Sequence, residues 1–154
     1  RTTRFMSPAP GAERLFRDAV LHLAGKAPFA RPLVNSGRRS RPCTYPLVGP
    51  DDLALPRDSR PGSVAPDAPL TQGWLIDQLG RDPVLLAIGQ PAPQVTGPKT
   101  LSLPATPELQ NRYLGPALAA LYLIRPDQTI AARWQTASPE AIAKATAAIW
   151  EDDT

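Results

Sequence analysis

The chain has 154 residues, which is enough for one ordinary domain and an appendage. Its one cysteine excludes an internal disulfide framework, and its one histidine excludes a histidine-based metal site or catalytic triad within the chain. No apolar run approaches the roughly 20 residues of a membrane-spanning helix, so we expect no membrane partner, and a lone thiol favours the reducing cytoplasm.

The net charge of +3 is unevenly placed. Residues 1–60 hold 11 Lys and Arg against 5 Asp and Glu, whereas residues 61–154 hold 6 against 9. Arg38, Arg39 and Arg41 form a basic cluster that could bind phosphate or pair with an acidic protein surface. Only Tyr45 is nearby for base stacking and no recognition motif is present, so we expect no nucleic acid and favour a protein surface.

The first predicted element is a helix over residues 12–24. Glu13 favours its first turn, and Gly25 is placed to end it. A helix this short is marginal in isolation, so its apolar face should dock on another domain. The residues predicted to make that interdomain contact, together with Arg38 and Arg39, are Leu15, Phe16, Val20 and Leu23.

Beyond this helix the composition changes twice. Residues 38–62 are rich in Arg, Pro and Asp and are predicted to be an extended linker, whereas an α/β pattern begins at residue 63. Its predicted elements are an edge segment (64–70), a short helix (74–80), a buried strand (83–89), a weaker strand (99–103), a helix capped by Thr106, a hairpin (121–134), and a helix capped by Ser138 with Ile142, Ala145, Ile149 and Trp150 as its apolar stripe.

This order predicts an α/β fold of the thioredoxin-like type. Such a fold has a central sheet, a closing antiparallel hairpin and a C-terminal helix. The expected organisation is a docking helix and segment (1–37), a Pro/Arg-rich linker (38–62) and a thioredoxin-like domain without redox cysteines (63–154).

The predicted hairpin also resembles a known family. Residues 121–134, LYLIRPDQTIAARW, are similar to a segment near the C-terminus of FAD-dependent aromatic-ring monooxygenases, the hydroxylases of phenolic acids and aromatic polyketides. Three further segments resemble the same family in the expected order: LFRDAVL (15–21), PFARPLVNSGR (28–38), and APDAPL with GWLIDQLG (65–80). Thr129 departs from the His of many relatives, and residues 90–119 show little resemblance.

The resemblance implies that this chain is the C-terminal region of a longer enzyme. The parent would use FAD and NAD(P)H to hydroxylate an aromatic ring. The flavin/substrate module would be this chain's partner, and a homo-oligomer is a further expectation. No G-x-G pair occurs among the ten glycines, so no dinucleotide-binding, catalytic or metal-binding residue is assigned here. The residues that carry the resemblance and are expected to be structural are Pro66, Asp67, Arg125, Pro126, Asp127 and Arg133.

Two alternatives stay open. The chain could be a free-standing, redox-inactive thioredoxin-like module that binds a protein through its first helix. It could also be a divergent peroxiredoxin-like enzyme, but the turn after the predicted strand at 83–89 is GQPAP and contains no cysteine. Cys43 lies in the predicted linker and His22 on the flank of the first helix, and both are expected to be incidental.

Overall fold

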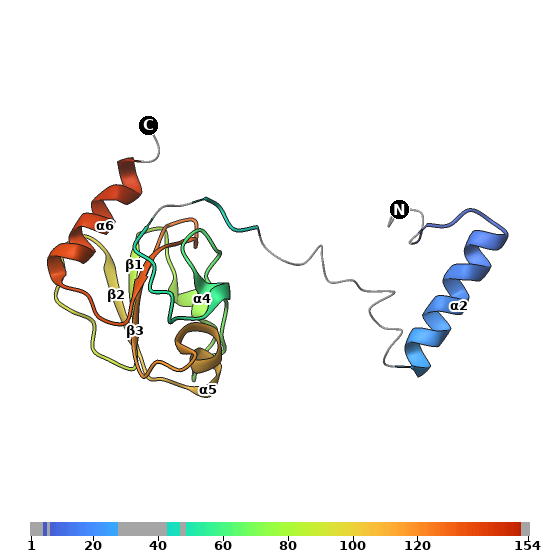
Figure 1. Ribbon diagram of the computed structural model, residues 1–154, viewed down its shortest axis with the longest axis horizontal. Helices are drawn as coiled ribbons and strands as arrows, with labels where there is room; N and C mark the ends of the chain where they lie inside the picture. The colour runs from blue at the N-terminus through green and yellow to red at the C-terminus, as the bar shows by residue number, and fades with distance from the viewer. Residues whose placement is uncertain (1–4, 6, 28–42, 47–48, 152–154) are drawn as a thin grey trace. The chain divides into compact units, whose positions relative to one another are not determined.

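The structure is a computed structural model that describes residues 5, 7–27, 43–46 and 49–151 (Figure 1). The chain divides into two compact units, Arg1–Arg41 and Pro42–Thr154. No helix in the part of the chain that the structure describes is long and apolar enough to cross a membrane.

The first unit contains helix α2, Ala12–Lys26, with Glu13 in its first turn and Lys26 in its last. The expectation that Gly25 ends this helix is wrong, because the helix continues through it to Lys26. Ala27 is the first extended residue, with φ −122° and ψ 116°. It precedes a proline, and the ring of a proline disfavours the helical conformation of the residue before it.

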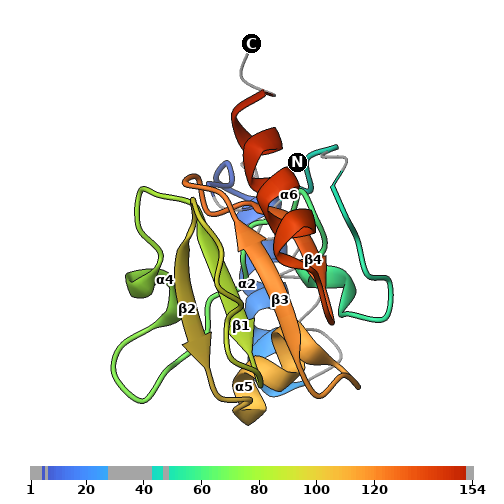
Figure 2. The ribbon, with the colours of Figure 1, turned by 90° about the vertical axis from the view of Figure 1, so that its left-hand side faces the viewer.

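The second unit is a mixed α/β domain built on a four-stranded sheet in the order β2-β1-β3-β4 (Figure 2). Its strands are β1 (Val84–Ile88), β2 (Lys99–Leu103), β3 (Ala120–Ile124) and β4 (Ile130–Trp134). Strands β1 and β2 pair in parallel, whereas β1 with β3 and β3 with β4 are antiparallel. The predicted strands and the predicted hairpin are therefore confirmed.

Alternation along the central strands builds a core on each face of the sheet. On one face Val84, Leu86 and Ile88 join the larger cluster, which includes Tyr122 and Ile130. On the other face Leu85 and Ala87 pack with Leu121 and with Ile142 of helix α6, Pro139–Glu151. All five residues of β1 are buried, as expected of a strand covered on both faces.

Short helices close the first face. They are η2 (Arg57–Ser59), α4 (Leu75–Gln78), α5 (Pro107–Leu109) and the single π-turn η3 (Gln110–Leu114). The Thr106 hydroxyl accepts a hydrogen bond from the Leu109 N–H, as predicted for a helix cap. In α6 the predicted stripe holds for Ile142 and Ile149 but is wrong for Trp150, which is 57% exposed. The i, i+4, i+7 spacing of the buried positions places Thr146 on that stripe instead.

The connection between the parallel strands β1 and β2, residues 89–98, contains no helix. Pro91, Pro93 and Pro98 disfavour one. Gly89 turns the chain out of β1 with φ +72°, and its Cα lies so close to Leu118 that a Cβ would collide with the Leu118 carbonyl oxygen. This connection therefore lacks the crossover helix that usually joins parallel strands.

The outer edge of β4 is covered by residues 49–66, which we call the strap. The Asp52 N–H donates to the Arg133 carbonyl and the Arg133 N–H to the Pro50 carbonyl, while Gly62 and Ser63 pair in the same way with Ile130. Residues 43–46 and 49–62, described parts of the expected linker, thus belong to the unit that begins at Pro42. Leu55 of the strap is part of the core.

Candidate functional site

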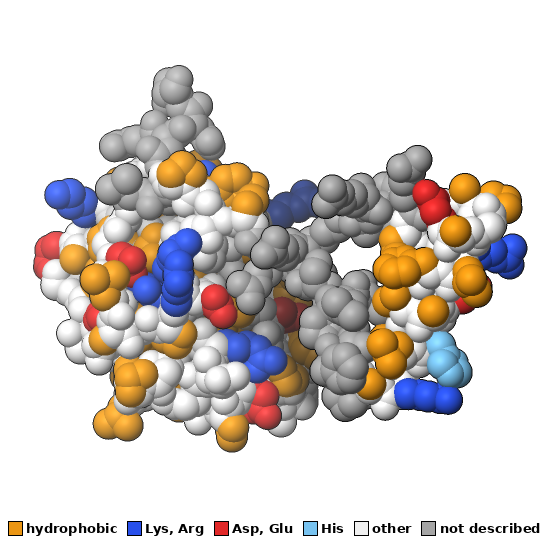
Figure 3. All heavy atoms as spheres, turned by 45° about the vertical axis from the view of Figure 1, so that its right-hand side comes forward, with side chains coloured by type: hydrophobic (Ala, Val, Ile, Leu, Met, Phe, Trp, Pro, Cys, Tyr) orange, Lys and Arg blue, Asp and Glu red, His pale blue; other side chains and the backbone are white. Residues whose placement is uncertain are grey.

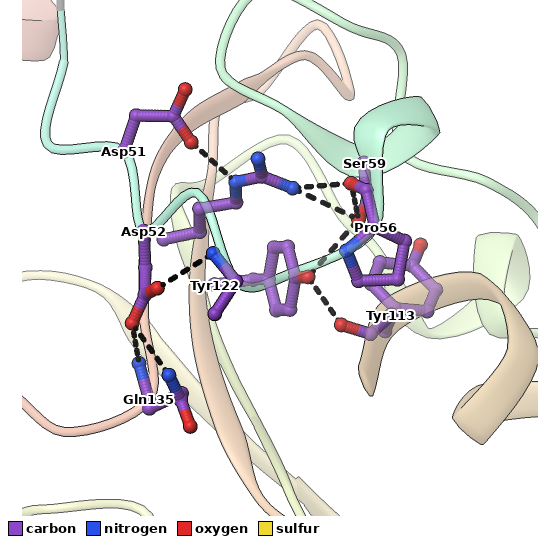
Figure 4. Close-up of polar contacts among 9 residues, drawn as sticks. Asp51, Asp52, Pro56, Ser59, Tyr113, Tyr122 and Gln135 are labelled. Carbon is purple, nitrogen blue, oxygen red and sulfur yellow. Dashed lines mark hydrogen bonds and ion pairs between the residues drawn. The ribbon is translucent and has the colours of Figure 1, made fainter. Parts of the chain in front are cut away.

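The most elaborate polar cluster surrounds Arg133, whose side chain is only 2% exposed. Figure 4 shows its partners Asp51, Pro56 and Ser59 converging on one guanidinium. Its Nε lies 2.6 Å from Oδ1 of Asp51, and its Nη1 donates to the carbonyl oxygen of Pro56 and, at 3.4 Å, to Oγ of Ser59. Every one of these acceptors belongs to the strap. A buried guanidinium needs such partners, because an unpaired buried charge is strongly destabilising.

Two tyrosines extend this cluster into the core. The Tyr122 hydroxyl lies 3.0 Å from Ser59 Oγ and donates to the Tyr113 carbonyl at 2.5 Å, while the Tyr113 hydroxyl donates to the Pro66 carbonyl at 2.6 Å. The rings meet edge to face at a centroid distance of 4.9 Å. Burial raises the pKa of both phenols above the ordinary tyrosine value. Both therefore stay neutral at physiological pH.

A second polar contact holds the strap beyond the end of β4. Oδ2 of Asp52 accepts from the backbone and side-chain amides of Gln135, and its Oδ1 accepts from the Ala54 N–H. The hydrogen bond from the Gln135 side chain is the main cause that lowers the pKa of Asp52 below its usual value. The Gln135 carbonyl in turn accepts from Nε2 of Gln90 at 3.0 Å.

These contacts hold the strap against the hairpin. Among the described residues, every buried side-chain nitrogen and oxygen has a hydrogen-bond partner. The two tyrosine hydroxyls donate to the Tyr113 and Pro66 carbonyls, and the guanidinium donates to groups of the strap. The cluster therefore stabilises the join between the strap and the hairpin.

A shallow, open depression of about 560 Å³ lies at the carboxyl ends of β1 and β2. Its lining is uncharged and consists of Gly89, Gln90, Pro91, Ser102, Leu103, Pro104, Ala105 and Leu118. It holds neither a thiol nor an imidazole, and the described residues contain no group of three His, Cys, Asp or Glu that could hold a metal ion. Leu118 is 88% exposed, so this surface is better suited to a protein segment than to an enclosed small molecule.

Several residues that carry the family resemblance make hydrogen bonds or ion pairs that hold local structure. Oδ1 of Asp67 accepts from the Ala68 and Ile76 N–H groups, which ties the segment before α4 to that helix. In the hairpin turn, Oδ1 of Asp127 accepts from the Thr129 N–H, and Oδ2 lies 3.6 Å from Nε of Arg125. The turn is completed by Gln128, which follows Pro126-Asp127 and has φ +65°.

The structure describes the predicted docking residues of α2 but not the predicted arginines. Leu15, Phe16 and Leu23 are 74%, 65% and 44% exposed, and hydrophobic side chains gather along α2 (Figure 3). Val20 is half-buried, and no described residue of α2 is fully buried. Arg38, Arg39 and Arg41 lie outside the described residues. Cys43 and His22 are both exposed.

Sequence reasoning missed most of the Arg133 cluster. The alternation in β4 placed Arg133 on the polar side of a half-covered strand, where an exposed guanidinium is the ordinary outcome. The acceptors come from Asp51, Pro56 and Ser59, more than 70 residues earlier in the chain. Adjacent Asp51 and Asp52 in a proline-rich segment were the only available signal, and it resembles a solvated linker.

Comparisons with known proteins give one solved structure. No family model matches the chain, and no curated protein matches it. The structure of the substrate-free form of the rebeccamycin biosynthetic enzyme REBC is similar, with 25% sequence identity, a TM-score of 0.49 and coverage of 90% of this chain. The match covers 28% of that chain, so this chain corresponds in length to less than a third of it.

Proposed function

We propose that this chain is the non-catalytic C-terminal region of an FAD- and NAD(P)H-dependent monooxygenase that hydroxylates an aromatic substrate. The observation that carries the proposal is the set of hydrogen bonds made by the residues that carry the family resemblance. Pro66, Asp67, Asp127 and Arg133 are engaged in structural hydrogen bonds in the second unit. A structural role for the region accounts for these bonds without requiring a reactive group.

The second unit would be a thioredoxin-like domain that has no redox function. In support, its strand order is β2-β1-β3-β4 with one parallel pair, a closing hairpin and helix α6 after it. Thiol redox chemistry needs a low-pKa thiolate, usually at the start of a helix. The residues after β1 are Gly89, Gln90 and Pro91, and no helix follows them before β2. Cys43 is exposed and lies in a non-helical segment.

The exposed apolar side chains of α2 would dock on the flavin/substrate module of the same protein. Burying a Leu or Phe side chain contributes about 1.5–3 kcal/mol, so the exposure of Leu15 and Phe16 is costly unless a partner covers them. The module would thus cover α2, and this chain would brace the module. FAD would supply the oxygen chemistry in the module, and no residue of this chain is assigned to it.

The test is to read the coding DNA upstream of the Arg1 codon and then to express the complete protein. We expect an unbroken frame that carries a G-x-G-x-x-G turn, and a purified protein with the visible absorption of bound flavin. A start codon directly before the Arg1 codon would overturn the proposal. It would favour instead a free-standing module that uses α2 to bind another protein.

A further inference from the structure

The carboxyl ends of three strands meet at one end of the sheet. Strands β1, β2 and β4 run in the same direction, because β1 is parallel to β2 while β3 is antiparallel to both β1 and β4. The open depression lies at this end, and the strap reaches it beyond β4. We propose that the strap controls one side of the depression through a hydrogen-bond relay of Asp52, Gln135 and Gln90.

Gln135 is the centre of the relay. Its backbone N–H and its side-chain Nε2 both donate to Oδ2 of Asp52, at 3.2 Å and 3.1 Å (Figure 4). Its carbonyl oxygen accepts from Nε2 of Gln90 at 3.0 Å. The β3–β4 ladder ends one residue earlier, at Trp134, so these are the hydrogen bonds that hold Gln135 within the described chain. Asp52 of the strap and Gln90 after β1 therefore hold opposite ends of one residue.

The other end of the relay is a side of the depression. Gln90 lines it from the connection after β1, and Ser102 lines it from β2. The Ala92 N–H donates to the Ser102 hydroxyl at 3.0 Å, which ties this connection to β2. Toward β4, the same connection is tied by the bond from Gln90 to Gln135. The position of Gln90 thus depends on where the Gln135 carbonyl is held.

The strap can lift while the sheet stays intact. It meets the hairpin through separate bridges rather than through a continuous ladder, and a segment held by few backbone bonds opens at a lower free energy than a ladder does. Lifting the strap at Asp52 removes the bonds to both nitrogens of Gln135. The carbonyl that positions Gln90 is then free to move, so this side of the depression is ordered only while the strap is closed.

The relay acts in both directions, because the coupling between two sites is reciprocal. Any group that takes the Gln90 amide as its own hydrogen-bond partner in the depression would release the Gln135 carbonyl and loosen the strap. The described residues that line the depression include none from the strap, so the strap acts on this surface through the relay and not by contact.

The test is hydrogen exchange of single backbone amides of the full chain, measured by NMR. Asp52→Ala breaks the relay in the strap, and its reporters are the Gly89 N–H, which donates to the Leu103 carbonyl, and the Ala92 N–H. The matched control is Asp58→Ala, which replaces another carboxylate of the strap, in helix η2.

The converse variant is Gln90→Met, which keeps the length of the side chain and removes its amide donor. Its reporters lie in the strap and are the Asp52 N–H, which donates to the Arg133 carbonyl, and the Ala54 N–H. The matched control is Ser102→Ala, which releases the Ala92 N–H of the same connection but leaves the relay in place.

We expect each relay variant to speed exchange of its reporters by about fivefold, the factor that a lost hydrogen bond of ordinary strength produces in a local opening equilibrium. The controls should leave the same reporters unchanged, and amides of the β1–β3 ladder should keep their rates in all four variants.

Changes confined to the mutated end of the relay would overturn the proposal, because the two ends would then be independent. Equal changes in the controls, or throughout the second unit, would also overturn it, since they would report a general loss of stability. If Asp52→Ala does not fold, Gln90→Met and its control decide between these outcomes. This inference does not depend on the proposed function, because the relay lies within the second unit alone.

Discussion

Asp51 supplies the negative charge beside a guanidinium that is almost completely removed from water. Replacing it by Ala leaves Arg133 with only the Pro56 carbonyl and the Ser59 hydroxyl as partners. Because the Asp51 side chain is itself 32% exposed, water can replace part of the lost interaction. We therefore expect Asp51→Ala to lower the free energy of unfolding by about 2 kcal/mol, measured by urea denaturation.

The matched control is Asp18→Ala, which removes the exposed ion pair between Asp18 and Arg17 in α2. An exposed pair contributes about 1 kcal/mol or less, and this one lies in the other unit, so the urea transition of the second unit should not move. If Asp51→Ala were as silent as the control, Arg133 would not depend on the strap for its charge balance.

Tyr113 and Tyr122 give the second unit a dependence on alkaline pH. Burial, the largest cause, raises the pKa of each phenol in the folded protein. A group with a raised folded-state pKa contributes its full stability below the unfolded-state pKa, about 10 for tyrosine, and loses it as the pH rises toward the folded-state value. We expect the free energy of unfolding to fall steeply above about pH 10.

Tyr113→Phe tests the assignment of this pH dependence. The variant should be less stable at neutral pH, because the Pro66 carbonyl loses its hydrogen bond, but its stability should fall less steeply above the tyrosine pKa. Urea denaturation at a series of pH values gives both slopes. Identical slopes for the two proteins would mean that Tyr113 is not the group that titrates.

At the scale of the elements, the strap decides where an independent domain can begin. A fragment of residues 42–154 keeps Asp51, Leu55 and Ser59, whereas a fragment of residues 63–154 loses all three. The shorter fragment exposes the β4 edge and leaves Arg133 without a counter-charge. We expect the longer fragment to unfold cooperatively on heating and the shorter fragment to show no cooperative transition. Circular dichroism measures both. A cooperative transition of residues 63–154 would show that the strap is dispensable.

The turn after β1 requires glycine at residue 89. Gly89→Ala would force a residue with a Cβ into φ +72° and against the Leu118 carbonyl. The positive φ alone costs about 1–2 kcal/mol, so the melting temperature of the second unit should fall. The control is Gly25→Ala, which lies inside helix α2 with open space around it and should raise helix content by circular dichroism. An unchanged melting temperature for Gly89→Ala would contradict the close approach at Leu118.

Regular periodicity explains which elements could be predicted from the sequence. The apolar run at 84–88, the alternation at 130–134 and the Pro126-Asp127 turn are local signals, and the structure places strands and a turn there. The strap has no period, because it joins the sheet through separate bridges such as Asp51 with Arg133 and Val64 with Thr129. Those bonds depend on residues far along the chain, so no local pattern reveals them.

At the scale of the whole molecule, the two units differ in what holds them together. The second unit has core clusters on both faces of its sheet, whereas the described part of the first is a helix with no buried residue. The sequence could predict that Leu15, Phe16 and Leu23 form an apolar stripe, since helical spacing alone defines it. It could not show what covers that stripe, because a partner surface leaves no trace in the spacing. The interdomain role of these residues therefore stays a prediction.

The most direct test of the proposed role compares the protein encoded by the full reading frame with a variant that lacks residues 42–154. The measurement is the single-turnover hydroxylation rate per bound flavin, together with the melting temperature and the oligomeric state. If this region braces a monooxygenase without taking part in the chemistry, as proposed, the rate per flavin should be unchanged while the melting temperature falls or assembly is lost. A rate that falls by orders of magnitude while flavin content, stability and assembly remain unchanged would contradict the account.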